Sequence, residues 1–236
     1  VFNDVFDITT DETERPDRPL PSGNIGKRDA LYLGVILFLT ALLCACLVNA
    51  TSVCISIVII ALILSYNAWT KTVPAIGTLN MGLCRFFNLM LGLSIIPASI
   101  STYWMFPLIL MIYVMLITAL SKQEVKGEQR WKIVFVISCF IGLVFFTGSL
   151  SVKGILPNHA MHGLLFIFTL IVLWPMGKAV INPCPKSIQS TIKTMVLSII
   201  ILDACFVMGA TNGLHALVVL ALLVPAYIIS RFLYVT

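Results

Sequence analysis

The feature that most constrains the fold of this sequence is a series of apolar runs, each about twenty residues long, separated by polar connections. A run of that length crosses the roughly 30 Å hydrocarbon core of a bilayer as an α-helix, which satisfies its backbone hydrogen bonds internally. Hydrophobic residues make up 59% of the chain and charged residues 11%, which excludes an ordinary soluble domain. The sequence therefore predicts an all-α, polytopic transmembrane helical bundle.

Connections that contain Pro, Gly, Asn or Lys divide the apolar part of the chain into eight predicted spans. The first four are expected at about 30–48, from the tight connection at 49–51 to 69, at 79–96 and at 103–120. The last four are expected at about 131–150, 158–177, 190–210 and from the turn at 211–213 to Tyr234. We expect all of them to belong to one domain over residues 1–236.

A cluster of oxygen-bearing side chains precedes the first span. If this segment is helical, its members fall within roughly 100° of one another, because a helix turns about 100° per residue. The members are Asn3, Asp4, Asp7 and Asp11. Like charges at this spacing repel, unless a cation lies between them, and carboxylate and amide oxygens suit Mg²⁺. The pattern favours a metal site, although an acidic helical face is more often a solvated surface.

Two arginines follow the acidic residues directly. Pro16 disfavours continuation of the helix, so Arg15 and Arg18 can turn back toward whatever a metal holds. A guanidinium group binds phosphate oxygens through parallel hydrogen bonds. Carboxylates for a metal and arginines for phosphate together indicate a diphosphate site.

The run NDVFDITTDETERPDRPLPSG resembles the first signature of the UbiA superfamily of membrane prenyltransferases, NDxxDxxxD followed by RPxRPLPSG. The resemblance implies a UbiA-type bundle that transfers a prenyl group from a prenyl diphosphate to an aromatic or other small lipophilic acceptor. It also implies Mg²⁺ bound by the acidic cluster, with Asp7 as a catalytic residue. Members carry one or two spans before this signature, so the sequence resembles a chain without its beginning. The run MGLCRFFNLMLGLS further resembles the narrower EboC-like subgroup.

Polar residues at the second and third spans extend the expected site. Tyr66 and Lys71 resemble the tyrosine and the basic residue that contact the diphosphate in the superfamily, although an aromatic belt with a snorkelling lysine looks the same. Arg85, Asn88 and Gly92 have i, i+3 and i+7 spacing on one helix face. Intramembrane charges usually face a cavity or a partner, which favours a catalytic or substrate-binding role over snorkelling.

The connection after the fourth predicted span reads SKQEVKGEQR. Members of the superfamily with well-understood chemistry carry a second aspartate-rich element here, whereas this chain keeps only Glu124 and Glu128 and adds Lys122. These three residues are candidates for substrate binding. The competing interpretation is a positively charged cytoplasmic loop with helix-pair charges.

Basic residues lie almost entirely on one side of the predicted topology. That side receives Arg15, Arg18, Lys27, Arg28, Lys71, Lys122, Lys126, Arg130, Lys132, Lys178, Lys186, Lys193 and Arg231, and the other side receives Lys153. By the positive-inside rule the acidic cluster faces the cytoplasm or its organellar equivalent, in a bacterial inner membrane or an organellar membrane. The basic excess therefore indicates orientation among lipids and phosphate binding, and we expect no nucleic-acid partner.

Two other classes of function are compatible with the sequence. A catalytically reduced UbiA-like subunit or lipid-binding scaffold of a larger complex would explain the weak second acidic element, and its partners would be other membrane subunits. A transporter is less favoured, because no inverted repeat or paired broken helices are evident.

Overall fold

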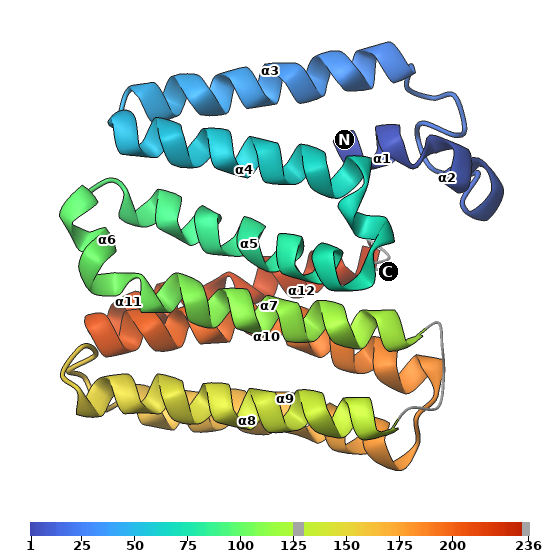
Figure 1. Cartoon of the computed structure of the whole chain (residues 1–236). Helices are drawn as coiled ribbons and strands as arrows, with labels where there is room; N and C mark the ends of the chain where they lie inside the picture. The colour runs from blue at the N-terminus through green and yellow to red at the C-terminus, as the bar shows by residue number, and fades with distance from the viewer. Residues whose placement is uncertain (125–129, 233–236) are drawn as a thin grey trace. The chain divides into compact units, whose positions relative to one another are not determined.

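The computed structural model describes residues 1–124 and 130–232, and every regular element within these residues is a helix (Figure 1). Eight candidate membrane spans lie within this part of the chain, each 18 to 26 residues long. The prediction of an all-α bundle with eight spans is therefore confirmed. The chain divides into two compact units, Val1–Met111 and Ile112–Thr236.

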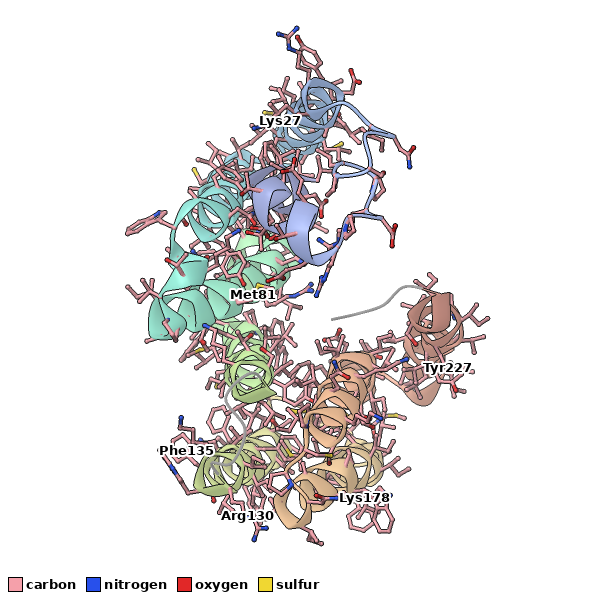
Figure 2. The ribbon with its side chains drawn as sticks, turned by 90° about the vertical axis from the view of Figure 1, so that its right-hand side faces the viewer. Lys27, Met81, Arg130, Phe135, Lys178 and Tyr227 are labelled. Atoms are coloured by element: carbon pink, nitrogen blue, oxygen red, sulfur yellow. The ribbon has the colours of Figure 1, made fainter. Side chains whose placement is uncertain are left out.

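The first unit combines long apolar helices with short helices at its amino-terminal end and in its connections. In chain order these are α1 (Phe2–Phe6), α2 (Ile8–Glu14), α3 (Lys27–Cys46), α4 (Ala50–Ala68), the 3₁₀-helix η1 (Thr70–Thr72), α5 (Pro74–Leu93), α6 (Pro97–Tyr103) and the start of α7 (Met105–Glu124). Helix α4 packs between α3 and α5, and α1 packs on α3 and α4. In Figure 2 this unit is seen from the end at which α2 and Lys27 of α3 lie.

Local sequence explains where the helices of the first unit begin. Asn49 caps α4, because its Oδ1 accepts a hydrogen bond from the Ser52 backbone N–H at 2.9 Å. Pro74 occupies the first turn of α5, where a missing N–H and a fixed φ are compatible with a helix. The third span was expected from about residue 79, with Pro74 and Gly77 in a loop. That expectation is wrong, because the proline starts the helix five residues earlier.

Helix α1 docks on α3 through a glycine. The ring of Phe2 stacks on Phe38 with centroids 4.7 Å apart, and Gly34 lies one turn before Phe38 on α3. A Cβ atom added to Gly34 would come within 2.6 Å of the Phe2 ring. The absence of a side chain at Gly34 therefore lets α1 lie directly against α3.

The second unit contains the remainder of α7 and five further described helices. These are α8 (Arg130–Val152), α9 (Met161–Ile181), α10 (Pro185–Ala210), α11 (Gly213–Ala221) and α12 (Leu223–Phe232). Tyr113, Phe140 and Phe168 form its buried aromatic centre, with ring centroids 5.5 to 6.0 Å apart. The Tyr113 hydroxyl lies 2.8 Å from Ser198 Oγ, so the polar end of this ring is satisfied inside the apolar core.

Prolines account for most of the differences between expected and observed spans. The third span was expected to end at about 96, before Pro97; α5 ends at Leu93, and Pro97 begins the short helix α6. Pro185 begins α10 five residues before the expected start at 190, and α9 continues through Pro175 to Ile181. The last span is divided at Leu222 into α11 and α12, and the predicted end at Tyr234 lies outside the described residues.

Candidate functional site

The acidic cluster Asn3, Asp4, Asp7 and Asp11 lies in residues 2–14, which we call the acidic segment. This segment forms two short helices, α1 and α2, that meet at Asp7. Asp7 has φ −95° and ψ 4°, which ends α1 and begins α2, so one uninterrupted helix is not formed. The i to i−4 register nevertheless continues across the bend: the Asp7 N–H donates to Asn3 O at 2.9 Å and the Asp11 N–H donates to Asp7 O at 2.8 Å. The backbone therefore keeps Asn3, Asp7 and Asp11 on successive turns.

Arg18 turns back on the acidic segment. Its Nη1 lies 2.7 Å from Asp11 Oδ2 and 3.7 Å from Asp4 Oδ1, so one nitrogen atom reaches two carboxylates. The following loop is closed by backbone hydrogen bonds, including Ile25 N–H to Pro19 O at 3.0 Å. Gly23 has φ +76° in this loop, a conformation that a glycine adopts at no steric cost. The Pro- and Gly-containing sequence thus brings the Arg18 guanidinium group onto the acids.

Lys71 approaches the same segment from the turn between α4 and α5. It is the central residue of η1, and its ammonium group contacts the Asp7 carboxylate. Asp7 and Lys71 are separated by 64 residues in the sequence. The pair therefore depends on the fold, and it joins α1 and α2 to the α4–α5 turn.

A buried hydrogen-bond network lies next to Lys71. Asn80 of α5 is 5% exposed, and its Nδ2 donates to Thr70 Oγ1 at 2.9 Å and to Ser65 Oγ at 3.0 Å. Asn67 is 6% exposed and donates to Ile63 O at 2.8 Å, while its Oδ1 has no hydrogen-bond partner among the described residues. None of these amides was singled out as a site residue from the sequence. The sequence signal that could have identified them is the presence of two asparagines in or beside apolar runs, because polar side chains are costly within a membrane.

The remaining candidates of the first unit are divided between two places. Tyr66 is half-buried, within electrostatic range of Asp7 and Cys84, so it lies at the Lys71 end of α4. Arg85 is exposed on α5 and forms no hydrogen bond or ion pair with any residue that the structure describes. Arg85 is about 16 Å along α5 from Pro74, at 1.5 Å per residue.

Asn88 lies on the wall of a cavity of about 490 Å³. Three helices line this cavity, through Ala45 of α3, Ser52 and Ser56 of α4, and Asn88 and Gly92 of α5, among others. Ser52 and Asn88 lie near the ends of α4 and α5 that are remote from Lys71, so the cavity belongs to the opposite end of these helices. The structure therefore does not bring Asn88 together with the acidic segment.

The candidates after the fourth predicted span belong to the residue range of the second unit. Lys122 is half-buried in the last turn of α7. The side chain of Glu124 and the whole of Glu128 lie outside what the structure describes. Their predicted role in substrate binding stays a prediction.

The acidic segment offers hard oxygen donors, and its carboxylates are paired with side-chain cations in this conformation. Asp4 and Asp11 share Arg18, Asp7 contacts Lys71, and Asn3 is exposed. Within the described ranges no three His, Cys, Asp or Glu side chains are gathered closely enough to hold a metal ion. Mg²⁺ requires oxygen atoms at about 2.1 Å, so it would have to draw these carboxylates closer or bind some of them through water.

Comparison with known proteins finds relatives by sequence and a solved structure with a similar fold. The chain is 33% identical over 103 residues to digeranylgeranylglyceryl phosphate synthase of Methanothrix thermoacetophila, a match that covers 43% of this chain and 39% of that protein. It is 26% identical over 229 residues to the synthase of Thermococcus sibiricus, covering 90% of this chain and 80% of that protein. A solved structure described as digeranylgeranylglyceryl phosphate synthase in membranes superposes with a TM-score of 0.65 at 19% identity, covering 89% of this chain and 79% of that one. The structural match supports the fold alone.

A family model identifies the chain through the part that carries the acidic segment and Lys71. The model of the UbiA prenyltransferase family matches residues 1–130, which is more than half of the chain. The matched region contains α1 to α7 and the ion pairs of Arg18 and Lys71 with the acidic segment. On this match, and on the all-helical membrane fold, the chain belongs to the UbiA prenyltransferase family.

Proposed function

We propose that this chain transfers a prenyl group from a prenyl diphosphate to a lipophilic acceptor within the membrane. The observation that carries this proposal is the convergence of Arg18 and Lys71 on Asp4, Asp7 and Asp11 at one end of the apolar helices. A prenyl diphosphate has a strongly anionic head and an apolar tail. Clustered acids and cations beside membrane-spanning helices match that combination, and the family membership supports it.

The donor set of the acidic segment fits Mg²⁺ by its chemistry. Carboxylate and amide oxygens are the ligands that Mg²⁺ prefers, and Asn3, Asp4, Asp7 and Asp11 would hold it. When bound, the ion would supply positive charge that stabilises the departing diphosphate. Arg18 already reaches two of the carboxylates with one nitrogen atom, which supports a single cation between them.

The cationic side chains would bind the phosphate oxygens of the donor. Lys71 and Arg18 lie beside the carboxylates, so each needs to turn only its own side chain to exchange a carboxylate for a phosphate. Arg15 follows α2 directly, and Tyr66 at the end of α4 can donate a hydrogen bond to the same head group. These donors would stabilise the diphosphate as it leaves and an allylic cation forms. The surrounding apolar helices would exclude the water that would otherwise quench that cation.

The acceptor we propose first is a glyceryl phosphate lipid that already carries one prenyl group. This proposal rests on the printed name of the relatives, digeranylgeranylglyceryl phosphate synthase. Arg85, which is exposed on α5 and unpaired within the described residues, would bind the phosphate of such an acceptor. An aromatic acceptor is the second candidate, as the superfamily resemblance implies.

A catalytically reduced subunit or lipid-binding scaffold is the alternative function. The chain carries Glu124, at the end of α7, and Glu128 in place of an aspartate-rich element, and Lys122 in the last turn of α7 suggests charge compensation by a lysine. On the resemblance of MGLCRFFNLMLGLS, we also propose that the chain is close to the EboC-like subgroup. If the alternative function is correct, partner membrane subunits would be required for any activity.

The test is prenyl transfer by the purified full-length protein in nanodiscs. Mass spectrometry would follow product from geranylgeranyl diphosphate and Mg²⁺ with either geranylgeranylglyceryl phosphate or a panel of aromatic acceptors. Asp7→Ala is expected to lower turnover by about 10²–10³-fold, because the charge balance at the departing diphosphate is lost. Glu12→Ala is the matched control, because Glu12 is exposed on α2 and takes no part in the ion pairs of the acidic segment with Arg18 and Lys71.

The outcomes separate the two functions. Product with the glyceryl phosphate acceptor, lost in Asp7→Ala and retained in Glu12→Ala, supports transfer to that class of lipid. Unchanged turnover in Asp7→Ala contradicts the proposed site. No product with any acceptor, together with stoichiometric copurification with a larger membrane assembly, supports the scaffold.

A further inference from the structure

Asn80 is the most completely buried amide of α5 among the described residues, and it ties three segments together. Its Nδ2 donates to Ser65 Oγ in α4 and to Thr70 Oγ1 in η1. Its Oδ1 lies 3.6 Å from Cys84 Sγ, one turn further along α5. The amide therefore connects the end of α4, the turn η1 and the start of α5.

The contact with Thr70 fixes the turn that carries Lys71. Thr70 is 4% exposed and opens η1, which is closed by backbone hydrogen bonds from Thr72 N–H to Trp69 O and from Val73 N–H to Thr70 O, both at 3.2 Å. Lys71 has a flexible four-carbon stem, so the place of its ammonium group depends strongly on where the backbone of η1 lies. The Lys71 ammonium group contacts Asp7, and the adjacent residue Thr70 accepts a hydrogen bond from Asn80 Nδ2.

We propose that Asn80 is a positioning residue that acts through Lys71. It holds η1 in the place from which the Lys71 ammonium group reaches the acidic segment and, resting on the proposed function, the diphosphate of the donor. The side-chain hydrogen bonds of Asn80 among the described residues go to Ser65, Thr70 and Cys84, and none goes to the acidic segment. The contribution of Asn80 to donor binding is therefore the orientation of Lys71.

The chemistry of the amide makes this role specific. An amide nitrogen carries two donor hydrogens, and Asn80 uses them on two hydroxyl acceptors in different segments. A leucine of similar size has no donor, so it would leave Thr70 and Ser65 without this tie. Removal of the tie frees η1 to shift, which is the movement that the proposal requires to weaken donor binding.

A double-mutant cycle between positions 80 and 71 tests the proposal. Binding of geranylgeranyl S-thiolodiphosphate, an unreactive donor analogue, would be measured by calorimetry with Mg²⁺ on the full-length protein in nanodiscs. Asn80→Leu is expected to weaken binding about tenfold when Lys71 is present. The same substitution is expected to weaken binding less than about twofold in a Lys71→Met background, because residues that act as a unit are not additive.

Asn49 supplies the matched control for a purely structural effect. It ties α4 to α5 at the other end of the same helices, donating from Nδ2 to Ser94 O at 2.7 Å and capping α4 through Oδ1. Asn49→Leu is expected to lower the unfolding temperature as Asn80→Leu does, with unchanged affinity for the analogue. If Asn80→Leu fails to fold, Thr70→Val replaces it, because this variant removes only the hydroxyl acceptor, and Thr70→Ser restores it.

The outcomes also distinguish this inference from the proposed function. Equal losses from Asn80→Leu with and without Lys71, or no loss at all, overturn the positioning role even if donor binding itself is confirmed. An equal loss of affinity in Asn49→Leu would overturn it as well. A wild-type protein that does not bind the analogue, or a Lys71→Met variant with unchanged affinity, would instead contradict the proposed function.

Discussion

At the scale of single residues, Arg18 pairs with a buried carboxylate and closes a loop. The structure pairs it with Asp11, which is 5% exposed, and a carboxylate at that depth requires a donor because it has lost most of its water. The same guanidinium group also closes the loop that follows α2. Its contribution to folding can therefore be measured separately from any contribution to phosphate binding.

We expect Arg18→Met to lower stability, because it leaves Asp11 without its partner. The cost is about 1–3 kcal/mol, the usual range for a buried acceptor that loses its hydrogen bond. Asp11→Asn in the same background should recover part of the loss, because a neutral amide is less costly to leave unpaired. Thermal unfolding in detergent measures both variants. A double variant that is no more stable than Arg18→Met would show that the pair does not act as described.

Sequence reasoning at this scale succeeded for neighbours in the chain and was incomplete for distant residues. The turn-by-turn spacing of Asn3, Asp7 and Asp11 and the return of Arg18 follow from local geometry. Lys71 could be associated with the acids only through the family resemblance and the predicted shared side of the membrane, because 64 residues separate it from Asp7. Asn80 was missed, since its partners depend on how α4, η1 and α5 face one another.

At the scale of elements, the docking of α1 on α3 sets the place of the acidic segment. The contact consists of the Phe2 and Phe38 rings over the bare backbone of Gly34. Because α1 is only five residues long, it has little hydrogen bonding of its own and depends on this packing. The position of Asp4 and Asp7 is therefore coupled to a glycine outside the site.

Gly34→Ala is expected to displace α1, because the new Cβ would lie 2.6 Å from the Phe2 ring. Overpacking of this kind costs about 1–3 kcal/mol, and affinity for a donor analogue should fall together with stability. Phe2→Ala alone should lower both as well, because it removes the ring through which α1 packs on α3. Gly142→Ala in α8 is the control, since an added Cβ there meets nothing within 4 Å. Equal behaviour of the two glycine variants would contradict the docking role of Gly34.

The spans themselves were predictable, whereas their limits were less so. Hydropathy finds the eight spans because a lipid environment leaves few alternatives to a helix. It misplaced the starts of α5 and α10 because a proline was treated as a terminator where it initiates a helix. Hydropathy also does not detect the bend at Asp7 or the division of the last span at Leu222, because each of these depends on the backbone angles of a single residue.

At the scale of the whole molecule, the distribution of basic residues predicts how the chain lies in the membrane. Most lysines and arginines lie near the helix ends that the predicted topology places on one side of the membrane. Lys153, which follows α8, lies on the opposite side in that topology. We therefore propose that the acidic segment faces the cytoplasmic or equivalent side. The proposed use of a charged, water-soluble head group requires this end to be reachable from an aqueous compartment.

Cysteine labelling in sealed vesicles measures this orientation. Single cysteines at Glu14 and Lys153, introduced after replacement of the seven native cysteines, would be exposed to a membrane-impermeant maleimide. Glu14→Cys is expected to react from the cytoplasmic side and Lys153→Cys from the opposite side, because α3 to α8 cross the bilayer an odd number of times between them. Reaction of both from one side, or the reverse arrangement, would contradict the predicted topology.

The most direct test of the central claim is a density map of the full-length protein with Mg²⁺ and geranylgeranyl S-thiolodiphosphate. The account predicts a metal within about 2.1 Å of carboxylate oxygens of the acidic segment, with Lys71 and Arg18 turned from Asp7 and Asp11 onto the diphosphate. A head group bound elsewhere, with Asp7 still on Lys71 and Asp11 still on Arg18, would contradict it.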